Sequence, residues 1–93
     1  MPTQILAVGS ANASSADVVV GAGESLTFSL KDTAGSYVDN GCIVDIMLKD
    51  DAGQYFRVDT LTAQKPAVVI SAAGTFRFSR RNKAGKSCGV FSG

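Results

Sequence analysis

The sequence predicts an all-β protein, folded as an antiparallel β-sandwich or jelly roll of about eight short strands. Short runs in which apolar and polar residues alternate recur along the chain, as strands with one buried face require. Most of the ten glycines lie between these runs, where turns are expected. No window of about eleven residues carries a helical period. The length of 93 residues allows one domain with a single small core.

The first three strands are expected at residues 5–8, 16–20 and 25–30. The third reads Ser-Leu-Thr-Phe-Ser-Leu, so alternation places its apolar side chains on one face and its hydroxyls on the other. The Gly-Ala-Gly-Glu segment at residues 21–24 turns the chain into this strand. This pattern is typical of a strand with one face in the core and the other in water.

The fourth and fifth strands, at residues 42–49 and 54–59, are predicted to form a hairpin. The Asp-Asp-Ala-Gly segment between them suits a four-residue loop, in which Gly53 can take a left-handed backbone conformation. Alternation in the fifth strand predicts that Phe56 and Val58 face the core and that Arg57 and Asp59 face solvent.

The last three strands are expected at residues 67–70, 75–81 and 87–92. Pro66 has no N–H for a strand ladder, so it should begin its strand or lie on a sheet edge. In the strand at 75–81, alternation turns the two phenylalanines inward and Arg77 and Arg81 outward. Arg80 falls on the phenylalanine side at the strand end, where we expect it to reach the rim.

The chain is expected to form one domain, with residues 1–15 as an N-terminal strand and flexible segment and residues 16–93 as the β-sandwich. The stretch 9–15 is polar and flexible, so the strand before it can act as an arm that pairs with a neighbouring subunit. No basic residue precedes Lys31 and no long apolar run occurs, so neither a secretory signal nor a membrane partner is expected.

Two cysteines, Cys42 and Cys88, permit one disulfide, but synthesis in a reducing cytosol favours two free, partly buried thiols. Two thiols alone do not complete a four-ligand zinc site. The chain has no histidine, which is the commonest general base and metal ligand. We therefore expect no metal and no cofactor.

No motif supplies catalytic chemistry either. The Ala-Gly-Lys-Ser segment at 84–87 ends like a phosphate-binding loop, but Arg80 stands where that loop needs its first glycine. Asp50 and Asp51 are adjacent and suit a solvated turn, with weak calcium binding as the alternative. We expect the protein not to be an enzyme.

The charges are distributed unevenly along the chain. Residues 1–64 hold eight acidic and three basic side chains, a net of −5, whereas residues 65–93 hold six basic and no acidic ones, a net of +6. Such asymmetry favours an electrostatic partner surface, although a solvated strand without a partner remains the simpler alternative. Nucleic acid is not expected, since exposed aromatic rings for stacking are scarce. The predicted partner interface comprises Arg77, Arg80, Arg81, Lys83, Lys86, Tyr55 and Met47.

Four segments, at residues 43–55, 65–70, 73–80 and 89–91, carry a resemblance to a known family. Together with the glycine turns between them, they resemble the small head decoration, or cement, proteins of tailed bacteriophages. The resemblance implies a virion protein, made in the bacterial cytoplasm, that binds the outside of the capsid and stabilises it. It further implies the major capsid protein as partner and a homo-dimer or homo-trimer. The family has no catalytic residue to transfer.

Two other functions remain open. One is a glycan-binding or adhesin module of a phage fibre or neck component, for which Tyr37 and Tyr55 are the candidate outward rings. The other is a small nucleic-acid-binding barrel, which would show an affinity that falls steeply with salt.

Overall fold

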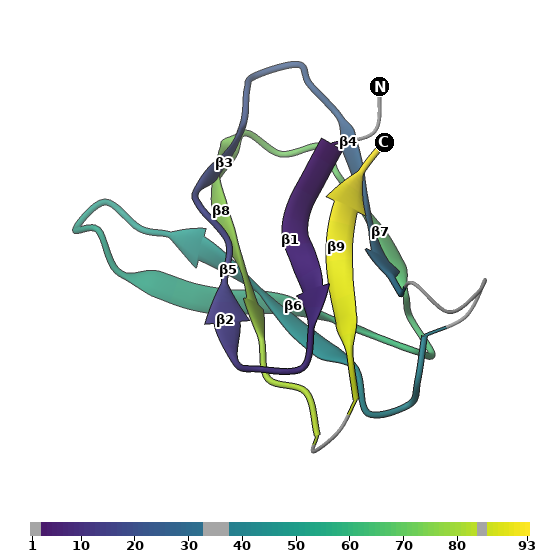
Figure 1. Ribbon diagram of the computed structural model, residues 1–93. Helices are drawn as coiled ribbons and strands as arrows, with labels where there is room; N and C mark the ends of the chain where they lie inside the picture. The colour runs from purple at the N-terminus through teal and green to yellow at the C-terminus, as the bar shows by residue number, and fades with distance from the viewer. Residues whose placement is uncertain (1–2, 33–37, 84–85) are drawn as a thin grey trace.

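Two antiparallel sheets face each other across a common apolar core (Figure 1). The computed structural model describes residues 3–32, 38–83 and 86–93. Within them the chain is all-β, which confirms the predicted fold class and is consistent with a β-sandwich. The nine strands of this described part are β1 (Thr3–Gly9), β2 (Ala13–Ser14), β3 (Val18–Val20), β4 (Leu26–Lys31), β5 (Ile43–Lys49), β6 (Tyr55–Thr62), β7 (Ala67–Ile70), β8 (Gly74–Arg80) and β9 (Cys88–Ser92).

The four-stranded sheet has the order β1-β9-β4-β7, and the five-stranded sheet has the order β2-β8-β5-β6, with β3 also paired to β8. Strands β6 and β7 are consecutive in the chain, but they are edge strands of different sheets. They therefore leave one side of the sandwich open between two sheet edges. Pro66 lies directly before β7, as its missing N–H predicts.

The core lies between the central strands of the two sheets. Phe28 from β4 and Phe78 from β8 are fully buried, and their ring centroids are 4.7 Å apart. A tilted aromatic pair at this spacing contributes about 1 kcal/mol beyond its buried area. Because Phe28 and Phe78 come from different sheets, their contact joins the two layers.

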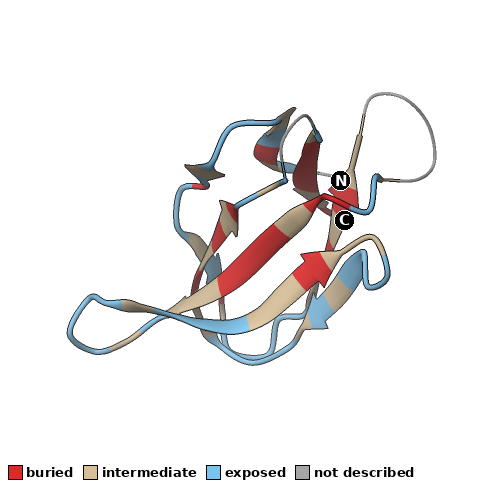
Figure 2. Ribbon diagram, turned by 90° about the horizontal axis from the view of Figure 1, so that it is seen from below, coloured by how far each residue is buried: buried red, intermediate tan, exposed pale blue. Residues whose placement is uncertain are grey.

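Phe56 and Val58 were expected to face the core, but neither residue is buried. Their side chains are 55% and 53% exposed. The β5–β6 register shifts between Ile46 and Met47, so the strict alternation of β6 is broken there. The turn end of this hairpin also extends beyond the other sheet (Figures 1 and 2). Phe56, which is close to that turn in the chain, is left exposed. Its loop agrees with the prediction, since Gly53 has a φ of 86°.

The expected position of Arg80 at the rim is also wrong, because its side chain is only 7% exposed. Its guanidinium donates hydrogen bonds to the carbonyl oxygens of Ala7 at 2.7 Å, Ala11 at 2.8 Å and Cys88 at 2.8 Å. Arg80 shares the inward face of β8 with Phe78, and the N-terminal segment closes over it. It therefore joins β8 to the other sheet and is not available to a partner.

The N-terminal segment is part of the sandwich in this structure. Strand β1 pairs with β9, and its Leu6 is 8% exposed and belongs to the core. The polar stretch that follows contains β2, which pairs with β8 and was not expected as a strand. Exchange of this segment between subunits stays a prediction.

Candidate functional site

The outer face of the five-stranded sheet brings together four of the predicted interface residues. Met47 on β5 lies opposite Arg77 on β8 and, on its other side, opposite Arg57 on β6. Tyr55 begins β6, and Arg81 follows β8 directly. The pleat of the sheet places Met47, Tyr55 and Arg77 on one surface, since directly opposed residues point the same way.

Asp17 gathers three of the side chains on this face. Its carboxylate accepts hydrogen bonds from the Tyr55 hydroxyl at 2.7 Å and from Arg77 Nη2 at 3.2 Å, and it lies 3.6 Å from Lys49 Nζ. The Tyr55 hydrogen bond, followed by the nearby Lys49 and Arg77 charges, lowers the pKa of Asp17. The same hydrogen bond raises the pKa of Tyr55.

The ring of Tyr55 is itself covered on one side. The guanidinium carbon of Arg77 lies 4.0 Å from the ring centroid, and Arg77 Nη2 donates to the Tyr55 hydroxyl at 2.9 Å. This cation–π contact occupies a face that a sugar ring would need for stacking. Tyr37, the other ring expected to face outward, lies outside the described residues.

A second ionic group surrounds Asp45, which is 9% exposed. Arg81 Nε donates to Asp45 Oδ2 at 2.7 Å, Thr60 Oγ1 donates to Oδ1 at 3.0 Å, and Arg57 Nη1 lies 4.0 Å away. The hydrogen bond and charge of Asp45 raise the pKa of Arg81. Asp45 thus holds two arginines against the sheet.

These pairings bring the acidic and the basic parts of the chain together. Arg77, Arg81 and Lys65 come from the basic C-terminal part of the chain, and each forms an ion pair with an aspartate of the acidic N-terminal part: Asp17, Asp45 and Asp59. The sheet register mixes the two signs, so on the outer face Asp17 and Asp45 each contact two basic side chains. Lys83 and Lys86 are exposed, and neither takes part in these three pairs.

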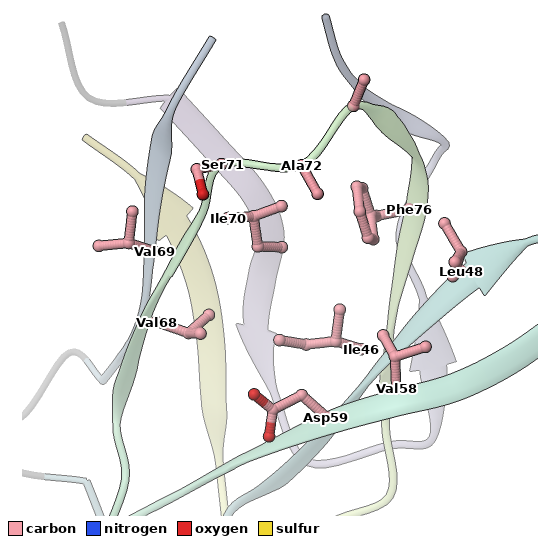
Figure 3. A pocket seen from close by; sticks show the side chains of 11 residues that line it. Ile46, Leu48, Val58, Asp59, Val68, Val69, Ile70, Ser71, Ala72 and Phe76 are labelled. Atoms are coloured by element: carbon pink, nitrogen blue, oxygen red, sulfur yellow. The ribbon is translucent and has the colours of Figure 1, made fainter. Parts of the chain in front are cut away.

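The open side between β6 and β7 holds an apolar groove of about 370 Å³ (Figure 3). Figure 3 shows Ile46, Val58, Val68, Ile70 and Phe76 around this groove, whereas the side chain of Val69 points away from it. Its one acidic lining residue, Asp59, binds Lys65 Nζ at 2.7 Å. The lining is otherwise uncharged: Ile46, Leu48, Val58, Val68, Val69, Ile70, Ser71, Ala72, Ala73 and Phe76.

Strand β7 forms one wall of this groove and leaves an open backbone edge. Leu30 N donates to Pro66 O at 2.8 Å, so Leu30 and Pro66 are a hydrogen-bonded pair between β4 and β7. Hydrogen-bonded pairs alternate along an antiparallel ladder, so the N–H and C=O groups of Ala67 and Val69 point away from β4. Residues 66–74 carry no charge, whereas exposed sheet edges usually carry charges that prevent pairing.

Exposed apolar side chains also occur on the two strands that border the groove. Phe56, Val58 and Val69 are each more than half exposed, and they lie on β6 and β7. Reasoning from alternation missed Phe56 and Val58 because it assumed a covering layer. The signal that was available is the uncharged run 66–74, which indicates an edge without protection.

Other kinds of site are not found in the described part of the chain. Residues 3–32, 38–83 and 86–93 contain no group of three or more Cys, Asp or Glu side chains that could hold a metal ion. Asp50, considered for calcium, instead accepts hydrogen bonds from the backbone N–H groups of Ala52 and Gln54. These same residues include no helix long and apolar enough to span a membrane. Comparisons with protein-family models, with curated proteins and with solved structures found no match to this chain.

Proposed function

We propose that this chain is a structural protein of a bacteriophage virion that attaches to the outside of the capsid and stabilises it. The observation that carries the proposal is the open side of the sandwich, where an uncharged strand edge adjoins an apolar groove. The contact surface proposed here is therefore the β6–β7 side, in place of the basic strand that the sequence favoured.

The chemistry of this side suits adhesion. The free N–H and C=O groups of Ala67 and Val69 can pair with an extended segment of the major capsid protein, as in strand addition to a sheet edge. The groove can then take apolar side chains from that segment, because side chains of the added strand alternate between its two faces. Burying the exposed part of Val58 or Val69 contributes about 1 kcal/mol each.

A capsid also multiplies weak contacts. It presents many copies of one surface, so a homo-dimer or homo-trimer would engage several sites at once. A modest interface per protomer then suffices for stable attachment. The ion pairs on the outer face of the five-stranded sheet leave that face polar, as suits a surface turned to solvent.

The glycan-binding alternative has less support. The candidate ring, Tyr55, lies against Arg77 and hydrogen-bonds to Asp17, so one face and its hydroxyl are already engaged. Binding on a glycan array that Tyr55→Ala abolishes, without attachment to capsids, would favour that alternative.

The test uses capsids stripped of the protein, to which purified protein is added before sedimentation. Wild-type protein should co-sediment with the capsids and raise the temperature at which they break. Val69→Lys places a charge on the proposed contact edge and should weaken attachment roughly tenfold or more. Val19→Lys is the matched control, because Val19 is also an exposed strand valine, at 67% against 59% for Val69, but lies on β3 of the other sheet.

Two outcomes would contradict the proposal. Absence of co-sedimentation for the wild-type protein would exclude capsid attachment. Equal loss of attachment for Val69→Lys and Val19→Lys would exclude the β6–β7 side as the contact surface.

A further inference from the structure

The two cysteines lie in the core at one end of the sandwich, in different sheets. Cys42 stands directly before β5 of the five-stranded sheet, and Cys88 begins β9 of the four-stranded sheet. Both thiols are free and both residues are 0% exposed. They are thus fully buried, where partly buried thiols were expected.

The hydrogen bonds of the two thiols connect the chain segments that surround the two cysteines. The Cys42 thiol donates to the carbonyl oxygen of Ser87 at 3.1 Å, and Ser87 is the chain neighbour of Cys88. The Cys88 thiol donates to Asn82 Oδ1 at 3.4 Å. That same oxygen accepts the N–H of Ile43, the chain neighbour of Cys42, at 2.8 Å. The Cys42 thiol therefore contacts the backbone beside Cys88 directly, and the Cys88 thiol is linked to the backbone beside Cys42 through Asn82.

The environment keeps these thiols unreactive while the protein is closed. Burial, with a contribution from the adjacent Cys88 thiol, raises the pKa of Cys42 to about 12. The thiolate is the reactive form, so the raised pKa and the full burial of Cys42 both disfavour its reaction at neutral pH in the folded protein. Reaction with any reagent requires local opening at this end of the sandwich.

We propose that Cys42 and Cys88 form a latent crosslink between the two sheets, which closes as a disulfide when the opened or folding chain meets a small-molecule disulfide. One cysteine thiolate attacks the reagent's S–S bond and releases one reagent thiol, leaving a mixed disulfide on the protein. The second cysteine then attacks that mixed disulfide and releases the second reagent thiol. The protein loses two hydrogen atoms, and the reagent is reduced to two thiols.

The crosslink would stabilise the fold, because it constrains the unfolded chain. It would close the loop from residue 42 to residue 88, which is about half the chain. A loop of this length predicts a rise in Tm on the order of 10 °C or more. The inference stands on the thiol geometry and does not depend on the proposed function.

The experiment refolds the full chain from denaturant, once with reduced glutathione and once with a mixture of oxidised and reduced glutathione. Each product is then unfolded in a thiol-alkylating reagent, and its intact mass is measured alongside its Tm. We expect the oxidised product to escape alkylation, to be lighter by two hydrogen atoms than the reduced chain, and to melt at the higher temperature. The folded, reduced protein should resist alkylation without denaturant.

Two single-cysteine variants test whether the disulfide joins Cys42 to Cys88. Cys42→Ala and Cys88→Ala should form no internal disulfide: the remaining cysteine is alkylated after reducing refolding, is alkylated or retains one glutathione after oxidative refolding, and brings no comparable rise in Tm. Oxidative refolding that leaves both wild-type thiols alkylatable would overturn the proposal. So would glutathione retained on the wild-type protein, or a crosslinked monomer that melts no higher than the reduced one. Because these readouts need only the wild-type chain, they decide the matter even if a variant does not fold.

Discussion

Arg80 Nη1 donates a hydrogen bond to the carbonyl oxygen of Cys88 at 2.8 Å, across the boundary between the two sheets. Burying a guanidinium against carbonyl oxygens costs desolvation free energy, and removing it also destabilises the fold, because the carbonyls then lose their partner. Arg80 thus serves the interior of the fold, although its position in a basic segment suggested a surface role.

Replacing Arg80 should therefore destabilise the protein strongly. Arg80→Met keeps much of the side-chain volume but leaves the carbonyl groups of Ala7, Ala11 and Cys88 without this donor. We expect a loss of about 3 kcal/mol in the free energy of unfolding, measured by urea denaturation. Arg81→Met is the control, since the Arg81 side chain is 49% exposed and its ion pair with Asp45 should contribute no more than about 1 kcal/mol. Equal losses for the two variants would contradict this assignment.

Gly89 should not tolerate a side chain. A Cβ at this position would lie 2.8 Å from Val8 N and 3.0 Å from Ala7 C, in the backbone of the paired strand β1. Gly89→Ala must push β1 away from β9, and we expect it to cost about 3 kcal/mol in the same urea experiment. Gly93→Ala should have little effect, because a Cβ there meets nothing within 4 Å. A stable Gly89→Ala variant would show that β1 can move without loss.

The pKa of Asp17 should depend on Tyr55. The Tyr55 hydroxyl is the largest cause of the lowered pKa of Asp17, so Tyr55→Phe should raise that pKa toward its ordinary value of 3.8. Carboxyl-carbon NMR during an acid titration measures this directly. An unchanged pKa in Tyr55→Phe would mean that the hydrogen bond is not maintained in solution.

The same group predicts a pH dependence of stability. Because folding lowers the pKa of Asp17, its contribution is fully present above the ordinary pKa of 3.8 and is lost as the pH falls through the lower, folded value. The Tm of the wild-type protein should therefore fall on acidification through this range, and Asp17→Asn should remove part of that fall. Identical pH profiles for the two proteins would exclude a contribution from Asp17.

Attachment to capsids should depend only weakly on salt. The proposed contact is apolar and uses backbone groups, whereas the nearby charges are already paired within the chain. Raising the salt concentration screens charges but leaves apolar burial intact. We expect binding to change less than roughly threefold between low and moderate salt in the sedimentation assay. A steep loss with salt would indicate that the exposed Lys83 and Lys86 carry the contact instead.

The sequence alone predicted strand type and most strand positions. Leu26–Lys31, Ile43–Lys49 and Gly74–Arg80 were all found where short alternating runs had placed them, because the period of a strand is local. The loop glycine at 53 was predictable for the same reason. Strand β2 was not predicted, since two residues in a polar stretch carry no period of their own and pair only because β8 lies beside them.

The candidate site was predicted less well. Alternation placed Arg77, Tyr55 and Met47 on the outer face correctly, but it could not show which aspartates would neutralise the arginines, since those lie far away in the chain. It also could not tell whether an alternating face would be covered. Phe56 and Arg80 illustrate the two resulting errors, because the apolar Phe56 is exposed and the charged Arg80 is buried.

Local pattern thus determined that this protein is an all-β chain with turns at its glycines, because backbone preference and side-chain period act over a few residues. Only the tertiary structure decided which charges pair, which strand ends are covered and where the sandwich stays open. Those outcomes depend on the register and relative position of two sheets, and they are set by contacts between residues that lie far apart in the sequence, such as Arg80 with Ala7.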